Sequence, residues 1–197
     1  MILEGIVTTL GPDGLLNVAP MGPRVEAEMR RFVLRPYRTA TTYRNLKERG
    51  EGVLHVTDDV LLLARSAVGL PVAPPTCPAD RVAGRVLLDS CRYYEFRVVA
   101  LDDRDDRTTI HAETVAEGRF RDFFGFNRGK HAVIEAAILA TRTAFLPIDE
   151  ILAEYRALAV LVEKTGGPDE FAAFELLHAY VTEVARQVGL DPESAPP

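Results

Sequence analysis

The spacing of apolar residues changes once along this chain. Up to about residue 117, apolar and polar positions alternate in short runs, which is the period of a β-strand. Beyond that point apolar residues recur every third or fourth position, which is the period of one helix face, as in Ile151, Leu152, Tyr155, Leu158 and Val162. The first two thirds of the chain therefore predict β-structure, and the last third predicts helices.

Six or seven strands in mostly antiparallel order are expected in the first part. Residues 2–20 predict a hairpin, because the sequence GPDG at 11–14 supplies the Pro and Gly of a tight turn. Further strands are predicted over 24–34, 52–58, 81–89, 91–101 and 108–116. This number of short antiparallel strands favours a barrel.

The strand predicted over 24–34 contains an irregularity. Val25, Ala27 and Met29 share one face, but the next apolar positions have the opposite parity. A strand cannot change faces without an extra residue, so we expect a bulge or bend near residues 30–31. Such a bulge would help the sheet to curl into a barrel.

Two short helices are predicted between the strands and three longer ones after them. The short helices span 41–49 and 58–69, and a glycine ends each of them. Residues 70–80 contain four prolines and predict an extended loop, while the acidic run 102–107 predicts a solvated turn. The longer helices are predicted over 129–144, 148–165 and 168–188, followed by a frayed tail, DPESAPP.

These elements define a fold class and a division of the chain. The fold is expected to be mainly β with α, a split antiparallel β-barrel followed by a C-terminal helical region. The barrel domain would span residues 1–127 and the helical extension residues 128–189. The extension would pack on the barrel or on a dimer partner.

Composition narrows the class of protein. The chain has 197 residues and a net charge of −6, and an acidic protein lacks the basic surface that nucleic-acid binding needs. No apolar run approaches the ~18 residues of a membrane span, and the N-terminus has no signal-peptide pattern. Two cysteines without CxxC spacing indicate free thiols and a cytoplasmic location, and no metal site is predicted.

Against this acidic background, residues 34–50 concentrate positive charge and hydroxyl groups. The segment LRPYRTATTYRNLKERG holds five basic residues and three threonines around the start of a predicted helix. A helix N-terminus offers unpaired N–H groups and a partial positive charge, and Arg and Thr side chains add further donors. This combination suits a phosphate monoester. The alternative is that one threonine is only an N-cap and the arginines are solvated.

A second segment, NVAPMGP at 17–23, ends the predicted hairpin with small residues and prolines. Small residues let a flat ligand approach the backbone, whose N–H groups can then bond to its edge. The alternative is an ordinary edge strand that ends at a proline.

Together these segments resemble the flavin-binding split-barrel superfamily, which includes flavin-reductase-like and pyridoxamine-phosphate-oxidase-like proteins. The shared order is a strand ending in Asn-x-Ala-Pro, a strand running into a Thr-rich turn, and Asn-Leu on a helix before a strand. FNRGKHAVIEAAILATR also has a counterpart in an archaeal and bacterial branch of the superfamily, so the resemblance covers most of the chain. The chain differs from typical flavin reductases at Met21-Gly22, where a hydroxyl residue often follows Ala-Pro.

The resemblance implies that FMN binds in a cleft between the two subunits of a homodimer. The residues implied to face the isoalloxazine edge are Asn17, Ala19, Pro20, Met21 and Gly22. Those implied to hold the ribityl phosphate are Arg38, Thr39, Thr41 and Thr42, and those implied to close the site from the helical region are Asn127, Arg128 and Lys130. We expect the nearby phenylalanines to be core or dimer contacts rather than flavin stackers, namely Phe120, Phe123, Phe124 and Phe126.

Three classes of function remain open on this basis. The first is an FMN-dependent oxidoreductase that draws on a nicotinamide donor, in which the cofactor carries the chemistry and no protein acid or base is required. The second is a non-catalytic dimeric protein that binds a flavin or another phosphate ligand. The third is a dimeric interaction module whose helical hairpin binds a partner protein. No catalytic residue is assigned; His131, beside the implied site, is the histidine that best fits a functional role.

Overall fold

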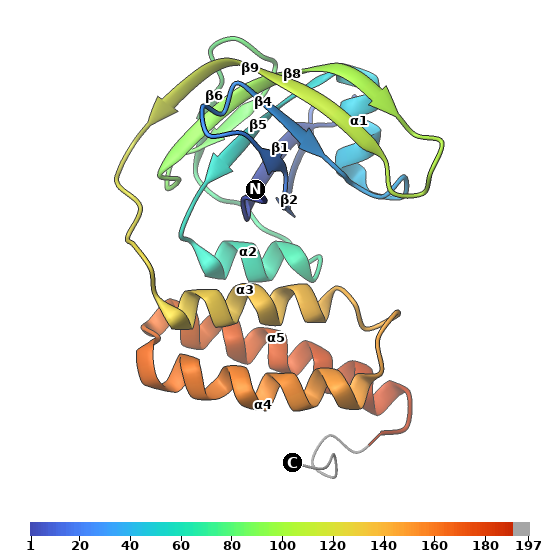
Figure 1. The fold of residues 1–197 in the computed structure, drawn as a ribbon, viewed down its shortest axis with the longest axis vertical. Coiled ribbons are helices and arrows are strands. Elements are labelled where there is room, and N and C mark those ends of the chain that lie inside the picture. Colours follow the sequence, from blue (N-terminus) through green and yellow to red (C-terminus); the bar gives the residue numbers. More distant parts are fainter. Residues whose placement is uncertain (191–197) are drawn as a thin grey trace. The chain divides into compact units, whose positions relative to one another are not determined.

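The computed structural model describes residues 1–190, which fall into two compact units (Figure 1). The first unit comprises residues 1–58 and 73–123, and the second comprises residues 59–72 together with the chain from residue 124 onward. The predicted frayed tail, DPESAPP, lies outside the described residues. The domain division between residues 127 and 128 stays a prediction of the sequence.

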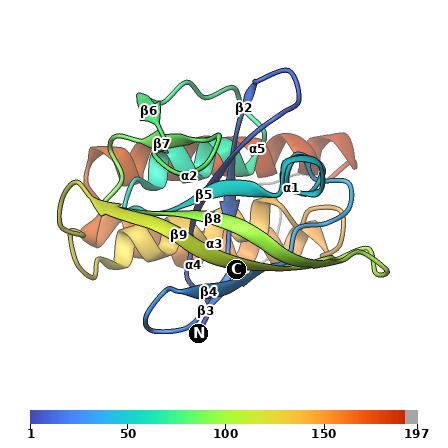
Figure 2. The ribbon, with the colours of Figure 1, turned by 90° about the horizontal axis from the view of Figure 1, so that it is seen from above.

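The first unit is built on a seven-stranded antiparallel sheet with the order β2-β1-β5-β8-β9-β4-β3 (Figure 2). A separate pair, β6 and β7, and one helix, α1, complete the unit. The bounds are β1 Gly5–Leu10, β2 Leu16–Met21, β3 Arg24–Val25, β4 Arg31–Leu34, α1 Thr41–Arg49, β5 Glu51–Val56, β6 Thr76–Pro78, β7 Arg85–Leu87, β8 Arg92–Asp102 and β9 Thr109–Arg119.

The sheet curls until β3 meets the N-terminal segment that leads into β1. Ile2, just before β1, forms an antiparallel bridge with Arg24 in β3. The backbone N–H of Val25 donates to the carbonyl of Met1 at 2.9 Å, so β3 pairs with the N-terminal segment as well as with β4. β2 is left as an edge strand outside this closure. The predicted split antiparallel barrel is therefore confirmed.

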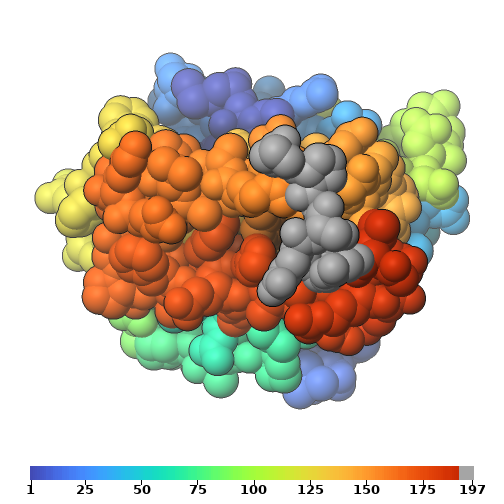
Figure 3. Space-filling model, turned by 90° about the horizontal axis from the view of Figure 1, so that it is seen from below, coloured from blue at the N-terminus to red at the C-terminus, as the bar shows by residue number. Residues whose placement is uncertain are grey.

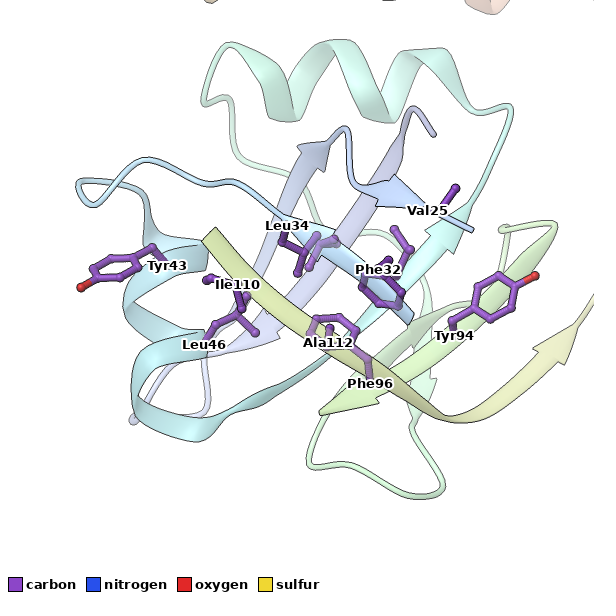
Figure 4. Close-up of a cluster of buried hydrophobic side chains, with 11 residues drawn as sticks. Val25, Phe32, Leu34, Tyr43, Leu46, Tyr94, Phe96, Ile110 and Ala112 are labelled. Carbon is purple, nitrogen blue, oxygen red and sulfur yellow. The ribbon is translucent and has the colours of Figure 1, made fainter. Parts of the chain in front are cut away.

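The interior of the barrel is filled by apolar side chains from all sides of the sheet (Figure 4). Phe32 on β4 and Phe96 on β8 pack edge to face, with ring centroids 5.2 Å apart. Leu46 on α1 is also buried in this cluster, so the helix is fixed to the barrel through its apolar face. The remaining members are Val7, Val25, Leu34, Tyr43, Leu54, Tyr94, Ile110 and Ala112.

The single bulged strand predicted over 24–34 is wrong. The segment forms a short hairpin in which Arg24 pairs with Val33 and Val25 with Phe32, and residues 26–30 make the turn. Met29 in this turn has a φ of 53°, in the left-handed region that chain reversals use. The slip in apolar parity therefore marks a reversal of the chain. The register shifts that help to curve the sheet lie elsewhere, between β8 and β9.

Other predicted elements differ mainly in length. The strand predicted over 81–89 shrinks to β7, and the predicted loop 70–80 contains the short strand β6. A buried carboxylate explains the shortening, because Glu95 on β8 accepts the backbone N–H groups of Asp80, Arg81 and Val82. These N–H groups are bound to a side chain and do not pair with a neighbouring strand.

The second unit consists of four helices: α2 Val60–Ala67, α3 Arg128–Ala140, α4 Ile148–Thr165 and α5 Pro168–Gln187. α4 and α5 pack side by side on one face (Figure 3, orange and red). At the centre of the unit, the buried Tyr155 hydroxyl donates to the carbonyl of Ala136 at 2.6 Å. All three long helices predicted from the sequence are present, and α3 ends a turn earlier than expected. None of the helices described is long and apolar enough to cross a membrane.

Candidate functional site

Helix α1 begins without a side-chain cap. Its N-cap residue is Ala40, which has no acceptor to offer, and its first turn contains no acidic residue. Thr41 and Thr42 occupy the first two helical positions, so neither is the N-cap that the alternative interpretation requires. The first-turn N–H groups thus lack the side-chain acceptor that most helices supply, and the positive end of the helix dipole is not neutralised. This helix end suits an anion.

Basic and hydroxyl side chains surround this helix end. The Arg44 guanidinium folds back over the first turn, donating to the Thr39 carbonyl at 2.8 Å and to the Thr41 hydroxyl at 2.9 Å. Arg38, Thr39 and Thr41 are exposed, and the backbone N–H of Arg38 is fixed by the Asp106 carbonyl at 2.8 Å. The structure thus brings the predicted phosphate residues to one turn. Arg44 joins these residues and was not among the predicted ones. It lies three residues after Thr41 on a helix, a spacing that makes their side chains neighbours and that could have identified it from the sequence.

The predicted ring-edge segment and the predicted phosphate segment meet through a polar network. The Asn17 side-chain amide on β2 donates to the Thr42 hydroxyl at 3.0 Å and to the Thr9 hydroxyl at 3.2 Å. Asn45 on α1 donates to the same Thr9 hydroxyl at 3.0 Å. Thr9, Thr42 and Asn45 are all buried. Thr9 was not among the candidates, because a single polar residue on a strand carries no distinctive spacing. Asn45 is the asparagine of the Asn-Leu pair on which the resemblance partly rests, but no role in the site was predicted for it.

Strand β2 presents the remaining predicted ring-edge residues along an open edge. Ala19, Pro20 and Met21 are half-buried and pair with β1 on one side only. An edge strand leaves a row of backbone N–H and C=O groups unpaired within its sheet, and it is the position where a sheet tolerates proline. Gly22 is exposed, and a Cβ there would lie 3.1 Å from the Ile2 side chain. Packing against the N-terminal segment therefore explains this glycine without a ligand.

The predicted residues of the helical region make contacts within the second unit. Asn127 caps α3 by accepting the Lys130 N–H, and its amide donates to the Thr165 carbonyl at 2.9 Å. The Lys130 ammonium lies 2.7 Å from a carboxylate oxygen of Glu170, and both side chains are mostly buried. Arg128 is exposed. These contacts give Asn127 and Lys130 structural roles, and the part of the three residues in binding a flavin stays a prediction from the resemblance.

The phenylalanine-rich segment is exposed rather than buried. Phe120, Phe123, Phe124 and Phe126 are 46%, 45%, 74% and 96% exposed, so the expectation that they join the core of the chain is wrong. The reason is local, because residues 120–127 form no helix or strand that could turn them inward. Their alternative role as dimer contacts stays a prediction. The His131 ring lies edge-on to Phe126, with centroids 6.0 Å apart.

A surface pocket of about 710 Å³ lies on the first unit. It is lined by the turn between β3 and β4 and by β9, and its lining includes none of the predicted site residues. Two of the lining residues, Arg31 and Glu113, form an ion pair with a nitrogen–oxygen distance of 2.8 Å. The lining residues are Glu26, Glu28, Arg30, Arg31, Glu113 and Thr114.

The buried histidine of the barrel has a structural role. His55 on β5 lies with Nδ1 3.1 Å from the Ile6 carbonyl, and its Nε2 accepts the N–H of Leu87 at 3.0 Å. Both ring nitrogens are thus used in one neutral tautomer. Burial lowers the pKa of His55 to about 4. Within the described residues, no group of three or more His, Cys, Asp or Glu side chains is placed to hold a metal ion.

Fold and site together define a split β-barrel protein with an uncapped, basic helix end beside an open edge strand. Residues 3–121 match the family model described as protein of unknown function (DUF447), N-terminal domain, and residues 127–179 match the model described as protein of unknown function (DUF447). The chain belongs to this DUF447 family. No match was found among curated proteins.

Solved structures share the fold. An FMN-bound protein of the same family model, from Methanosarcina mazei, superposes with a TM-score of 0.80 at 24% identity and covers 91% of this chain and 94% of its own. A flavoredoxin from Methanosarcina acetivorans gives 0.51 at 12% identity, covering 60% and 68%. Nitrilotriacetate monooxygenase component B from Bacillus cereus gives 0.50 at 18% identity, covering 60% and 70%. These structures confirm the fold that the resemblance to the FMN-binding split-barrel superfamily predicted.

Proposed function

We propose that this protein binds FMN, with the ribityl phosphate at the N-terminus of α1 and the edge of the isoalloxazine ring along β2. The observation that carries the proposal is the uncapped first turn of α1, which is joined to β2 by the hydrogen bond from Asn17 to Thr42. A phosphate placed there would accept hydrogen bonds from first-turn N–H groups that have no side-chain cap. The FMN-bound state of the related Methanosarcina mazei protein supports the same ligand.

The phosphate end of the site would be held by residues on one turn. Thr39, Thr41 and Arg38 are exposed and can donate to phosphate oxygens, while the buried Thr42 hydroxyl is held by Asn17. Arg44 is already fixed across this turn and would contribute positive charge without a large loss of side-chain entropy. FMN carries two negative charges on one small group, which explains how an acidic protein can bind it through local basic residues.

The ring end would use backbone groups of β2 and of Gly22, the residue that follows it. Ala19, Pro20, Met21 and Gly22 leave the strand edge open to a flat group, and unpaired backbone groups on that edge can bond to the polar rim of the ring. When bound, FMN would supply hydride or single-electron transfer. The protein would contribute orientation and hydrogen bonds to the ring.

The proposal has two finer parts. The protein would form a homodimer with FMN in the cleft between the subunits, and it would turn over with NADH or NADPH. The open edge of β2 and the exposed phenylalanines at 120–126 provide surfaces that a second subunit could cover. The names of the relatives from Methanosarcina acetivorans and Bacillus cereus, a flavoredoxin and a monooxygenase component, favour a redox role. The second candidate is a non-catalytic protein that binds a flavin or another phosphate ligand. The cytoplasmic location stays a prediction of the sequence.

An absorbance spectrum of the full chain tests the cofactor. The protein is mixed with excess FMN, desalted, and scanned over about 300–550 nm for the two flavin bands, with riboflavin as a parallel ligand that lacks the phosphate. Retention of FMN but not of riboflavin supports the phosphate site, and retention of neither overturns the proposal. Anaerobic addition of NADH or NADPH then separates the two candidates. Bleaching of the bound flavin indicates a reductase, and an inert flavin indicates the non-catalytic alternative.

A further inference from the structure

The acidic run at 102–107 packs against the segment that leads into α1. The turn between β8 and β9 lies beside the chain that connects β4 to α1 (Figure 1). Tyr37 forms an antiparallel bridge with Arg107, and the Arg107 guanidinium lies 5.6 Å from the centroid of the Tyr37 ring. The Pro36 carbonyl accepts both the N–H and the hydroxyl of Thr108. The turn is thus joined to the predicted phosphate segment, and the expectation that it is merely solvated is incomplete.

One carboxylate in this turn is bonded to α1 itself. Oδ2 of Asp103 accepts the Tyr43 hydroxyl at 2.7 Å and lies 2.7 Å from the Lys47 ammonium. Lys47 also donates to the Tyr43 hydroxyl at 3.1 Å, so the three groups form a closed triangle. The hydrogen bond from Lys47 lowers the pKa of Asp103 below its ordinary value, which keeps this carboxylate charged.

This triangle bonds α1 to the turn between β8 and β9. Tyr43 is the third helical residue and its ring is buried in the barrel core, while its hydroxyl reaches Asp103. The helix has no side-chain cap to fix its N-terminal turn. Tyr43 is therefore held from two sides, by the core through its ring and by Asp103 through its hydroxyl.

We propose that Asp103 is a positioning residue for phosphate binding: it holds Tyr43 and Lys47 so that the first-turn N–H groups of α1 converge on the anion. The inference rests on the proposed function, because it assumes that the phosphate of FMN binds at this helix end. A binding site whose donors are fixed in advance loses less entropy when the ligand arrives, so fixing the turn favours binding.

Positioning and simple electrostatics predict opposite results at Asp103. A carboxylate near a phosphate repels it, so removing the charge alone would strengthen FMN binding. Removing a positioning group frees the first turn and weakens FMN binding. Asp105 provides a control in the same turn, because it carries the same charge, it is exposed, and its side chain interacts electrostatically with the neighbouring Arg104.

The test compares Asp103→Ala, Tyr43→Phe and Asp105→Asn in the full chain. Dissociation constants for FMN and riboflavin are measured by quenching of flavin fluorescence, and circular dichroism and thermal unfolding check the fold. Tyr43→Phe keeps the buried ring and loses only the hydroxyl, so it carries the test if Asp103→Ala does not fold.

We expect Asp103→Ala to raise the dissociation constant of FMN about tenfold, which corresponds to the loss of roughly one charged hydrogen bond in placing the turn. Tyr43→Phe should raise it severalfold, and Asp105→Asn should leave it unchanged or lower it. The constant for riboflavin should change less than about twofold in every variant. The inference is overturned if Asp103→Ala behaves like Asp105→Asn, or if FMN and riboflavin weaken equally. Failure of the unaltered protein to bind FMN overturns the proposed function itself and is seen before any variant is made.

Discussion

The Asn17 side chain on β2 donates a 3.0 Å hydrogen bond to the buried hydroxyl of Thr42 on α1. This bond joins two segments that lie 25 residues apart in the chain and belong to different elements. A ligand whose two ends are held by these segments therefore meets a spacing that is fixed before it binds. Thr42 also differs from its neighbour Thr41, which is exposed and touched by Arg44.

Thr41→Val and Thr42→Val should have different consequences. Thr41→Val removes an exposed hydroxyl, so we expect FMN to bind about tenfold more weakly with a loss of stability below about 0.5 kcal/mol. Thr42→Val removes a buried hydroxyl and leaves the half-buried Asn17 amide with one acceptor fewer, so we expect a loss of about 1–2 kcal/mol in the free energy of unfolding. Urea unfolding and FMN titration measure the two quantities. Thr141→Val, at an exposed helix end in the other unit, is the control and should change neither.

Supplying the missing cap should stabilise the helix and block the ligand. Ala40 has the extended backbone, with φ −72° and ψ 142°, that N-cap residues adopt. We expect both Ala40→Asp and Ala40→Asn to stabilise the protein by about 0.5–2 kcal/mol. Ala40→Asp should also abolish FMN binding, because its carboxylate takes the place of the phosphate, whereas the neutral Asn should weaken binding less. Equal FMN affinity in the Asp and Asn variants would count against a phosphate at this helix end.

His55 should make stability fall in mild acid. Its pKa in the folded protein is lowered to about 4, against about 6.5 in an unfolded chain, so the unfolded state takes up a proton first as the pH falls. The stability from the neutral, buried ring is complete above about pH 6.5 and is lost as the pH falls towards 4, by at most ~3 kcal/mol. Urea unfolding at several pH values measures this slope. His111→Gln, which changes an exposed histidine, should retain the slope, and His55→Gln should remove most of it.

Lys130→Met should destabilise the helical unit whether or not a flavin is present. The substitution leaves the Glu170 carboxylate, 2.7 Å from the lost ammonium, buried without its cation. Removing one member of a buried pair commonly costs about 3–5 kcal/mol, and the partial exposure of Lys130 places the expected loss near the lower end. Thermal unfolding without FMN measures the effect. Arg128→Ala, at an exposed neighbour, should leave the melting temperature unchanged.

Local signals in the sequence were sufficient for most of the fold. Gly50 ends α1 where predicted, with a φ of 69°. Prolines and glycines also mark the ends of α4 and α5 in the sequence. They can be read directly, because such residues end or begin a helix through their own backbone conformation. The reversal between β3 and β4 was missed because its turn, residues 26–30, contains neither glycine nor proline. Met29 adopts the left-handed conformation there, and methionine has no preference for that conformation from which the turn could be predicted.

The candidate site was predictable only in part, for a related reason. Arg38, Thr39, Thr41 and Thr42 are neighbours in the chain, so their arrangement follows once the helix start is known. The contact of Asp103 with Tyr43 spans 60 residues and depends on how the β8–β9 turn folds back. Such long-range contacts are fixed by the curl of the whole sheet. No window of sequence contains that information.

The edge strand β2 also bears on the behaviour of the protein at high concentration. An open edge is a template on which strands of other molecules can pair, which is a common route to aggregation. Pro20 lies within this strand, and a proline in a paired edge strand turns its missing N–H towards the open side. A foreign strand added along β2 would lack a hydrogen bond at that point. Pro20, which we propose leaves the edge clear for a flat ligand, therefore also disfavours edge-to-edge assembly.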